Sequence, residues 1–444
     1  MHPSSDDPRN VLNGCKLPGL TYCDQPYLIE PDDGSLLCVM TTGSGVEGEP
    51  GQHVAVFKSF DSGKTWSSPV PLEPVNGPES SYAVLLKSAT GRLYCFYNYN
   101  AENIREVIPI GLDEVKNTPY RHDSIGYYNS IRQNVAPFEN GKCTRVDTLG
   151  TFVFRYSDDN GDTWSAKRYT IPVREMEMDR NNVYKGAVRY FWNVGRPFIV
   201  DNEVFVPFIK VGDFGPGYMV SSEGVLLKSA NLLSEREPGK AQWETLPEGD
   251  IGLRTPKGGG PIAEEHSFTV LSDGSFYCVY RSVDGYPVFA ISRDKGKHWT
   301  EPAYLCYANG RKVKHPRAAN FVWRCKNGKY LYWFHNQGGH FVRDDVETAY
   351  AHRNPVWLCG GVEIDTPNGK SIAWSPPDII LYDDDPLIRM SYPDLIEYRG
   401  KYLITETQKH LAHIHELDET LLKGLWRETA SQEEKPILEA AGTH

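Results

Sequence analysis

Paired apolar runs, each pair separated by a polar turn that contains Gly or Asn, recur six times along the chain. The runs have the length and the β-branched and aromatic content of strands, and the turns have the residues that tight reversals require, so each unit predicts a β-hairpin. The six hairpins begin at Pro26, Ala83, Pro197, Ser267, Asn320 and Asp394. Their regular recurrence predicts several small sheets of the same kind, not one large sheet.

A second repeat follows the hairpins. The pattern Ser-x-Asp-x-Gly-x-(Thr/His)-Trp occurs three times, as SFDSGKTW from Ser59, SDDNGDTW from Ser157 and SRDKGKHW from Ser292. Its Asp can accept backbone hydrogen bonds, its Gly can take a positive φ, and its Trp can pack between strands. Looser versions end at Trp243 and Trp374. The sixth hairpin lacks such a turn, so we expect an N-terminal strand before Asp24 to complete its sheet and close a ring.

The octet is the Asp box of the sialidase (BNR) superfamily, and residues 20 to 408 resemble that family. The resemblance implies an all-β fold, a six-bladed β-propeller of sialidase type. We expect one domain over residues 1–444, with a core at about 20–408, an insertion in blade 2 at about 100–150 and a C-terminal helix and tail at 409–444. The Asp boxes are expected to staple the fold, remote from any chemistry.

Two segments depart from the repeat. The insertion is rich in polar and turn residues, and a loop of that length is more often a functional rim or lid than an idle connection. Its position after the second hairpin could place it over the channel mouth. Near the C-terminus, Asp418 can cap a helix whose apolar residues, Leu421, Leu422, Leu425 and Trp426, recur at helical spacing.

Composition limits the partners. A net charge of −11 argues against nucleic acid and anionic membranes, which require a basic face. No run approaches the ~20 apolar residues of a membrane span, so we expect no membrane insertion. The nine cysteines cannot all pair and show no CxxC, and no HExxH or EF-hand motif occurs, so we expect no cofactor and no metal. The protein would be cytoplasmic if Met1 is the native start, and periplasmic or secreted if a signal peptide was removed; the oligomeric state stays open.

The sialidase resemblance extends to candidate site residues. A catalytic Glu of the family opens a hairpin whose second strand ends in an Arg, and the segment from Glu265 to Arg281 fits. Arg353 and Tyr392 match the next Arg and the Tyr that opens the last hairpin. The resemblance implies that Tyr392 is a nucleophile, that Glu265 withdraws its proton, and that both arginines bind an anionic group. We therefore expect Tyr392 and Glu265 to lie within hydrogen-bonding distance and the two arginines to converge.

The first blade departs from the family pattern. Sialidases open it with Tyr-Arg-Ile-Pro, whereas this chain has Cys23-Asp24-Gln25-Pro26. We expect Asp24 to face the bound sugar, where it would accept hydrogen bonds from hydroxyl groups or donate a proton. A carboxylate ~4 Å from Asp24 would be repelled by about 4 kcal/mol at an effective dielectric constant near 20, which makes ordinary sialic acid a poor substrate.

The acid/base Asp of the family has no clean equivalent before the first Asp box. The titratable candidates on that loop are Glu47, Glu49 and His53, and we expect Glu49 and His53 to contact the substrate. The start of each inner strand and the end of the next strand should meet at the channel mouth. Among the residues at these positions, we expect four more to contact the substrate: His266, Arg317, His335 and Asn336.

These features predict an exo-acting glycoside hydrolase that removes a terminal sugar, with acidic and sulfated sugars among the candidates, from an oligosaccharide or glycan. A phenol nucleophile suits a sugar with a carboxylate on its anomeric carbon, because a carboxylate nucleophile would be repelled. Without that group, Asp24, Glu265 and a loop acid could supply the usual carboxylate pair. Two alternatives stay open: a true exo-α-sialidase whose missing arginine is replaced by Arg196 or Arg317, and a carbohydrate-binding propeller without turnover.

Overall fold

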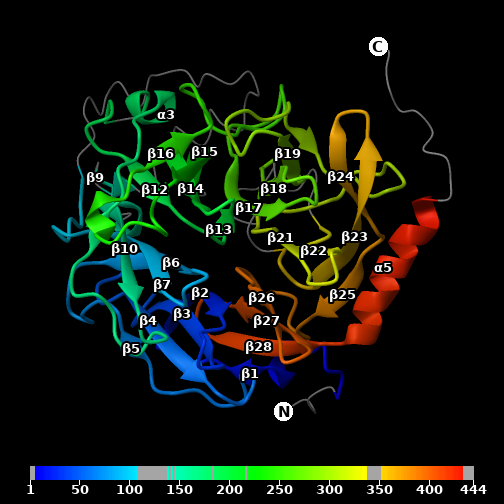
Figure 1. The fold of residues 1–444 in the computed structure, drawn as a ribbon, viewed down its shortest axis with the longest axis horizontal. Helices are drawn as coiled ribbons and strands as arrows, with labels where there is room; N and C mark the ends of the chain where they lie inside the picture. The colour runs from blue at the N-terminus through cyan, green and yellow to red at the C-terminus, as the bar shows by residue number, and fades with distance from the viewer. Residues whose placement is uncertain are drawn as a thin grey trace.

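Six antiparallel sheets follow one another around a common centre in the order of the chain (Figure 1). The computed structural model describes residues 6–107, 138–139, 142–143, 146–182, 184–215, 218–337 and 352–433. The prediction of an all-β, six-bladed β-propeller is confirmed.

The first three blades are built from the following strands. Blade 1 contains β2 (Tyr22–Ile29), β3 (Leu36–Gly43), β4 (His53–Ser59) and β5 (Val70–Pro71). Blade 2 contains β6 (Ser80–Lys87), β7 (Leu93–Tyr99), β10 (Thr151–Ser157) and β11 (Tyr169–Thr170). Blade 3 contains β12 (Tyr190–Trp192), β13 (Phe198–Val200), β14 (Glu203–Gly215), β15 (Tyr218–Ser229) and β16 (Glu244–Leu246).

The other three blades complete the ring. Blade 4 contains β17 (Glu264–Val270), β18 (Phe276–Arg281), β19 (Val288–Ser292) and β20 (Ala303–Tyr304). Blade 5 contains β21 (Phe321–Arg324), β22 (Tyr330–Phe334), β23 (Val356–Thr366), β24 (Gly369–Trp374) and β25 (Asp378–Leu381). Blade 6 contains β26 (Leu395–Tyr398), β27 (Lys401–Thr407), β28 (Ala412–Leu417) and β1 (Cys15–Lys16).

Short elements lie in the connections between these strands. They are η1 (Val11–Asn13), β8 (Phe138–Glu139), β9 (Lys142–Cys143), η2 (Val146–Thr148), α3 (Glu177–Arg180) and η3 (Pro238–Lys240). The predicted insertion joins β7 to β10 in blade 2, and residues 108–137 of it lie outside the described residues, so its expected position over the channel mouth is not tested.

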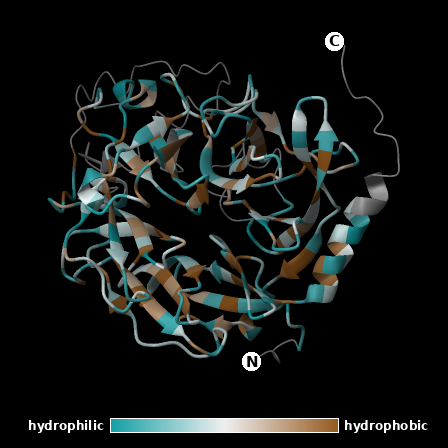
Figure 2. Cartoon of the chain, in the orientation of Figure 1, coloured by the Kyte–Doolittle hydropathy of each residue, from teal (hydrophilic) through white to brown (hydrophobic). Residues whose placement is uncertain are grey.

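Blade-to-blade packing explains the apolar runs of the sequence. A strand between two neighbouring blades is covered on both faces, so it reads as a nearly continuous hydrophobic run and not as an alternation. All eight residues of β3 are buried, and Cys38 in its middle, like Cys95 and Cys278, is a fully buried free thiol. Figure 2 shows the hydrophobic residues concentrated along the strands, with hydrophilic residues mainly in the connecting loops.

The three octets form the same hydrogen-bonded turn. In the first, the Ser59 hydroxyl donates to Asp61 at 2.9 Å and accepts the Gly63 N–H at 2.9 Å. Asp61 also accepts the N–H of Thr65 at 2.8 Å, and the Trp66 indole donates to the Gly63 carbonyl at 3.0 Å. The octets from Ser157 and Ser292 repeat the Ser–Asp, Gly–Ser and Asp–amide bonds.

The octets lie at the end of the blades opposite to the candidate site. Ser59 pairs with Leu36 at the beginning of β3, whereas Asp24 pairs with Thr41 near the other end of that strand. The turns therefore hold the third and fourth strands together without approaching the channel mouth where the inner strands begin, as the sequence predicts.

The N-terminal segment closes the ring. In β1, Cys15 pairs with Ile414 and Lys16 pairs with His413, which makes β1 the outer strand of blade 6. Blades 6 and 1 are also joined near the centre, where Thr405 and Thr407 donate to the carbonyls of Pro26 and Cys23 at 2.6 and 2.5 Å. The expected closing strand before Asp24 is thus confirmed.

The C-terminal helix α5 (Glu419–Glu433) packs against blade 5. The Asp418 carboxylate accepts the N–H of Thr420 at 2.7 Å, which is the predicted cap. Leu422, Leu425 and Trp426 are buried, and the Trp426 indole donates to the Tyr330 carbonyl at 2.8 Å. Within the described part of the chain, no helix has both the length and the apolar character needed to cross a membrane.

Replacing Trp426 with Ala should loosen α5 from blade 5. The substitution removes a buried ring and leaves the Tyr330 carbonyl without its donor, so we expect the free energy of unfolding to fall by about 3–5 kcal/mol. Chemical denaturation monitored by far-UV circular dichroism measures this loss. The control is Phe60→Ala, at an exposed ring, which should change stability by no more than about 0.5 kcal/mol. Equal losses in both variants would contradict the proposed docking role of α5.

Candidate active site

A pocket of about 630 Å³ lies where the inner ends of five blades meet. Its wall is formed by side chains from blades 1, 3, 4 and 6 and from the loops that flank blade 5. The lining residues are Thr21, Tyr22, Gly45, Val46, Glu47, Trp192, Arg281, Arg353, Leu387, Ile388, Arg389, Ser391, Tyr392, Gln408, Lys409 and His410. Contributions from so many blades place the pocket at the centre of the ring.

Tyr392 and Glu265 are joined at this pocket. The Tyr392 hydroxyl donates to Glu265 Oε1 at 2.7 Å, although the two residues open different blades. Tyr392 lines the pocket and is 5% exposed, whereas Glu265 lies behind it and is fully buried. The expected hydrogen-bonding distance between these two side chains is confirmed.

Strained backbone at the inner strands aims these side chains. Gln25, Tyr82, Glu265 and Tyr392 all have a left-handed φ, between 47° and 59°. In blades 1, 2 and 4 the pairing of the first two strands shifts register at this point, which is the signature of a β-bulge. A left-handed conformation of a non-glycine residue is unfavourable and persists where the surrounding structure enforces it, often at functional sites.

Burial and neighbouring charges set the protonation of the two acids beside Tyr392. Burial raises the pKa of Glu265 above its ordinary value; Arg281 opposes the shift and the Glu264 carboxylate adds to it. Burial also acts to raise the pKa of Glu264, but the guanidinium groups of Arg281 and Arg317 outweigh it and hold that pKa below its ordinary value. Burial, reinforced by the Glu265 charge, raises the pKa of Tyr392 well above the usual range. The phenol is therefore held neutral, next to an acid of raised basicity.

Arg281 and Arg353 converge as expected, because both line the pocket beside Tyr392. Arg281 is paired with Glu264 at 2.9 Å and with Glu265 at 2.8 Å. Arg353 donates to the Ser391 hydroxyl at 2.6 Å and to the Arg317 carbonyl at 3.2 Å. These contacts hold both guanidinium groups at the pocket wall.

Asp24 requires a correction. Its side chain is fully buried and is not among the residues that line the pocket, so it does not face a bound sugar as expected. One carboxylate oxygen accepts the Tyr22 hydroxyl at 2.8 Å and lies 2.8 Å from Lys409 Nζ. Burial raises the pKa of Asp24 and the Lys409 charge opposes that shift. The expected repulsion of an anion is therefore largely cancelled, because a cation stands between Asp24 and the pocket.

Lys409 brings a third strong cation into the pocket wall. Its ammonium group lies 4.7 Å from the centre of the Tyr392 ring and 3.4 Å from Glu47 Oε1. Burial acts to lower the pKa of Lys409, but the charges of Asp24 and Glu47 outweigh it and raise that pKa. Lys409, in the turn between β27 and β28, thus offsets the negative charge of Asp24 in the first blade.

Of the three loop candidates, Glu47 is the one that reaches the pocket. It accepts the Tyr82 hydroxyl at 3.2 Å, and the same hydroxyl also donates to Asp147, at the end of the insertion. Glu49 is instead exposed and accepts the Val46 N–H at 3.3 Å. His53 is buried with Nδ1 2.9 Å from the Gly51 carbonyl. The expectation that Glu49 and His53 contact substrate is not supported.

Four further expected contacts lie behind the pocket wall. His266 is fully buried and stacks on Tyr280 with ring centres 4.3 Å apart. Arg317 is bonded to Glu264 and to the Met219 carbonyl at 2.9 and 2.6 Å. His335 is buried with its ring stacked beside His315, and Asn336 accepts the Tyr307 hydroxyl at 3.5 Å. None of the four is among the described residues that line the pocket, and of the four Arg317 is bonded to Glu264.

Arg196 is also not among the residues that line this pocket; it donates to Asp394 and to the Leu28 and Leu395 carbonyls.

The sequence does not predict two segments that line the pocket, the turn from Gln408 to His410 and the loop from Leu387 to Arg389. The turn carried a readable signal, since it follows β27, the second strand of blade 6, at the end that faces the mouth. The loop carried none, because its contact depends on how blades 5 and 6 meet.

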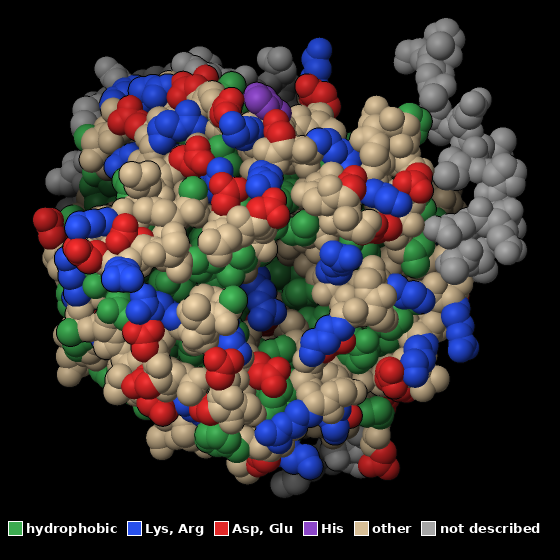
Figure 3. Space-filling view, viewed as in Figure 1, with side chains coloured by type: hydrophobic (Ala, Val, Ile, Leu, Met, Phe, Trp, Pro, Cys, Tyr) green, Lys and Arg blue, Asp and Glu red, His purple; other side chains and the backbone are tan. Residues whose placement is uncertain are grey.

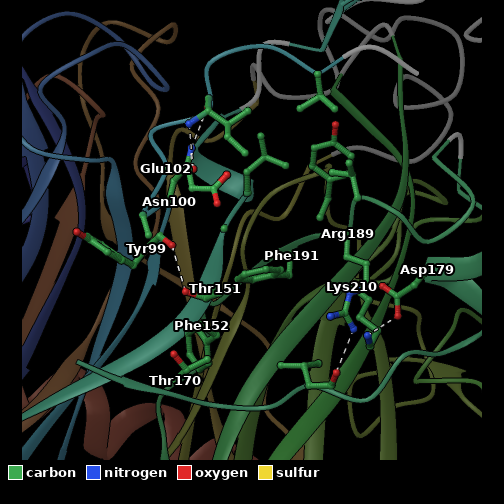
Figure 4. A pocket seen from close by; sticks show the side chains of 18 of the residues that line it. Tyr99, Asn100, Glu102, Thr151, Phe152, Thr170, Asp179, Arg189, Phe191 and Lys210 are labelled. Atoms are coloured by element: carbon green, nitrogen blue, oxygen red, sulfur yellow. Dashed lines mark hydrogen bonds and ion pairs between the residues drawn. The ribbon is translucent and has the colours of Figure 1, made fainter. Parts of the chain in front are cut away.

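A second, larger pocket of about 950 Å³ lies between blades 2 and 3 at the base of the insertion. Figure 4 shows Lys210 directed at Asp179, and their ion pair measures 2.5 Å. The lining is otherwise mostly apolar and includes none of the predicted site residues.

Figure 3 shows that one face of the ring is hollowed at its centre, with charges of both signs around the hollow.

Comparisons with known proteins support the fold. No protein-family model matches the chain, and no curated protein matches it in sequence. Among solved structures, the intramolecular trans-sialidase from Ruminococcus gnavus, in complex with oseltamivir carboxylate, is 15% identical over 93% of this chain and 98% of that one, with a TM-score of 0.57. A leech intramolecular trans-sialidase complexed with 2,7-anhydro-Neu5Ac is 15% identical over 91% of this chain and 69% of that one, with a TM-score of 0.55. A protein of unknown function from Dyadobacter fermentans is also 15% identical, over 91% and 98%, with a TM-score of 0.56.

The chain therefore has the sialidase-type fold. At this level of identity the likeness establishes the architecture alone.

Replacing Lys409 with Met should leave the Asp24 carboxylate buried without its counter-ion. We expect the free energy of unfolding to fall by about 1–3 kcal/mol at neutral pH, and most of that loss to be recovered in the double variant Asp24→Asn/Lys409→Met. Denaturant unfolding of the wild type, both single variants and the double variant measures the coupling. The control is Lys401→Met, at an exposed pair with Glu416, which should lose about 1 kcal/mol or less. Additive effects of the two changes would contradict the pairing.

Proposed function

We propose that this protein is an exo-acting glycoside hydrolase that removes a terminal sugar carrying a carboxylate. The observation that carries the proposal is the 2.7 Å hydrogen bond from Tyr392 to Glu265, at a pocket whose wall holds Arg281, Arg353 and Lys409. A volume of about 630 Å³ suits a small ligand such as one or two sugar rings, which favours a terminal unit. The sialidase-type fold supports a glycan as the partner.

In the proposed reaction, the Tyr392 oxygen attacks the anomeric carbon as the glycosidic bond breaks. Glu265 takes the phenol proton, and Glu47 donates a proton to the departing oxygen. Water then attacks the tyrosyl-linked sugar, and Glu47 takes a proton from that water. The departing Tyr392 oxygen takes its proton back from Glu265. Two displacements at one carbon retain the anomeric configuration.

The charge of the pocket favours an anionic substrate. Four cationic side chains line it, Arg281, Arg353, Arg389 and Lys409. Arg281 is offset by Glu264 and Glu265, and Lys409 by Asp24 and Glu47, whereas Arg353 donates to the Ser391 hydroxyl and the Arg317 carbonyl. A neutral phenol can approach an anomeric carbon that bears a carboxylate, where a carboxylate nucleophile would be repelled. These features support a sugar acid over a neutral sugar.

An exo-α-sialidase is the second candidate function, and Lys409 is the observation that favours it. Its ammonium group pairs with Asp24 and so offsets the acid that stands where sialidases have an arginine. Arg196 and Arg317, the replacements that the sequence suggests, do not line the pocket. A panel of fluorogenic glycosides of sialic acid, glucuronic acid, sulfated sugars and neutral sugars separates these substrates.

Tyr392→Phe should abolish turnover of the substrate that this panel identifies. The phenyl ring fills the same space but has no nucleophilic oxygen, so we expect kcat to fall by roughly a thousandfold or more. Tyr27→Phe is the matched control, because Tyr27 is a buried tyrosine of blade 1 whose hydroxyl has no hydrogen-bond partner in the part of the chain that the structure describes. Near-normal activity of Tyr392→Phe would rule out the nucleophile, and binding of glycans without turnover of any would indicate a carbohydrate-binding propeller.

The pH dependence of turnover should report on Glu265. Its raised pKa places the acid limb of the kcat/KM profile above the ordinary carboxyl value of 4.5, because the base must be deprotonated. Glu264→Gln keeps an acceptor oxygen for Arg281 and removes a charge that raises the pKa of Glu265, so the limb should move to lower pH. The control is Glu73→Gln, at a buried acid paired with Arg168, which should leave the limb in place. A shift to higher pH in Glu264→Gln would contradict the assignment.

A further inference from the structure

Three potential metal ligands gather on one face of blade 6, and none of them lines the candidate active site. Glu406 lies on β27, and His413 and His415 lie on the neighbouring strand β28. Glu406 pairs directly with His413, and alternate residues of a strand point to the same side, so His415 joins them on that side. The three residues are 0%, 7% and 5% exposed.

Their donor atoms are close enough to share one ion. His413 Nδ1 lies 2.8 Å from Glu406 Oε1, and His415 Nε2 lies 3.8 Å from the same oxygen. All three donors lie within 4.8 Å of one another. Tetrahedral zinc with bonds of about 2.0–2.1 Å separates its ligand atoms by roughly 3.4 Å, so small side-chain adjustments would suffice.

Two of the polar atoms in this group have no partner among the described residues. Glu406 Oε2 and His415 Nε2 are buried there without a hydrogen bond. An unsatisfied buried polar group is unfavourable by about 1–3 kcal/mol, so two of them in one cluster require an explanation. A cation coordinated by the carboxylate and by both imidazoles would satisfy both atoms at once.

We propose that Glu406, His413 and His415 bind a zinc ion. Two imidazoles and one carboxylate are a ligand set that zinc accepts, and a water molecule would complete a tetrahedral site. The alternative occupant is a proton, which would make the cluster a Glu–His ion pair. A proton on His413 Nδ1 would be donated to Glu406 Oε1, 2.8 Å away. His415 Nε2 would still have no hydrogen-bond partner among the described residues.

The ion would strengthen the closure of the ring. Strand β28 carries His413 and His415 and is also the strand on which β1 docks. A Cβ atom at Gly14, just before β1, would lie only 2.3 Å from His415 Cε1, so the N-terminal segment packs directly on this imidazole. Fixing the imidazole by coordination would fix the surface that receives the closing strand. The site is therefore structural, and it is independent of the proposed glycosidase activity.

Metal content and thermal unfolding of the full-length protein test the proposal. Protein purified without a histidine tag should retain about one zinc per chain by elemental analysis after gel filtration. Treatment with a chelator should lower the melting temperature by several degrees, and added Zn²⁺ should restore it. Co²⁺ added to the chelated protein should give the visible absorption bands of a histidine-ligated site of low coordination number.

Variants locate the ion. His415→Gln and Glu406→Gln should each lose the bound metal and the metal-dependent change in melting temperature. The matched control is His298→Thr, since Thr occupies the equivalent position in the other two octets; this variant should bind metal as the wild type does. If wild-type protein binds neither Zn²⁺ nor Co²⁺ and its melting temperature ignores the chelator, the cluster is an ion pair and the proposal is wrong, whether or not the variants fold. Retention of the metal by His415→Gln would also overturn it.

Discussion

The candidate site depends on a backbone constraint at the centre of the ring. Gln25, Tyr82, Glu265 and Tyr392 open their blades in a left-handed conformation that side chains disfavour. A neighbouring blade holds Tyr82 at this point, because its N–H donates to Thr41 Oγ1 of blade 1 at 3.0 Å. The hydrogen bond between Tyr392 and Glu265 joins two such residues, so its geometry is a product of the complete ring and not of either blade.

Most of the fold could be predicted from the sequence because it rests on local rules repeated many times. A hairpin is fixed by its apolar runs and turn residues, and an octet turn by a Ser, an Asp and a Gly within a few positions. The missing octet of blade 6 even predicted the closing strand. The helix cap at Asp418 was predicted on the same basis, since capping involves only neighbouring residues.

The site was harder to predict because its charges act between segments that are distant in sequence. Tyr392, Glu265, Arg281 and Arg353 were found through their positions at strand ends and the family resemblance. Asp24 was misjudged because its effect depends on Lys409, whose approach is set by how blades 6 and 1 meet. The histidines of β28 carried a readable signal, two His residues separated by one on a strand, but Glu406 joins them only through pairing across strands.

The closing strand comes from the opposite end of the chain to its partner. Since Cys15 pairs with Ile414, β1 has no partner strand until the segment through residue 417 has been synthesised and folded. The entropy of joining distant segments grows only slowly with their separation, as about (3/2)RT ln n, so distance itself is a modest obstacle. The greater hazard is the edge of β28 that stays free until β1 docks on it, because an unpaired edge can associate with other chains. Changes before Lys16 should therefore affect the yield of folded protein, through aggregation, more than the stability of molecules that have already closed.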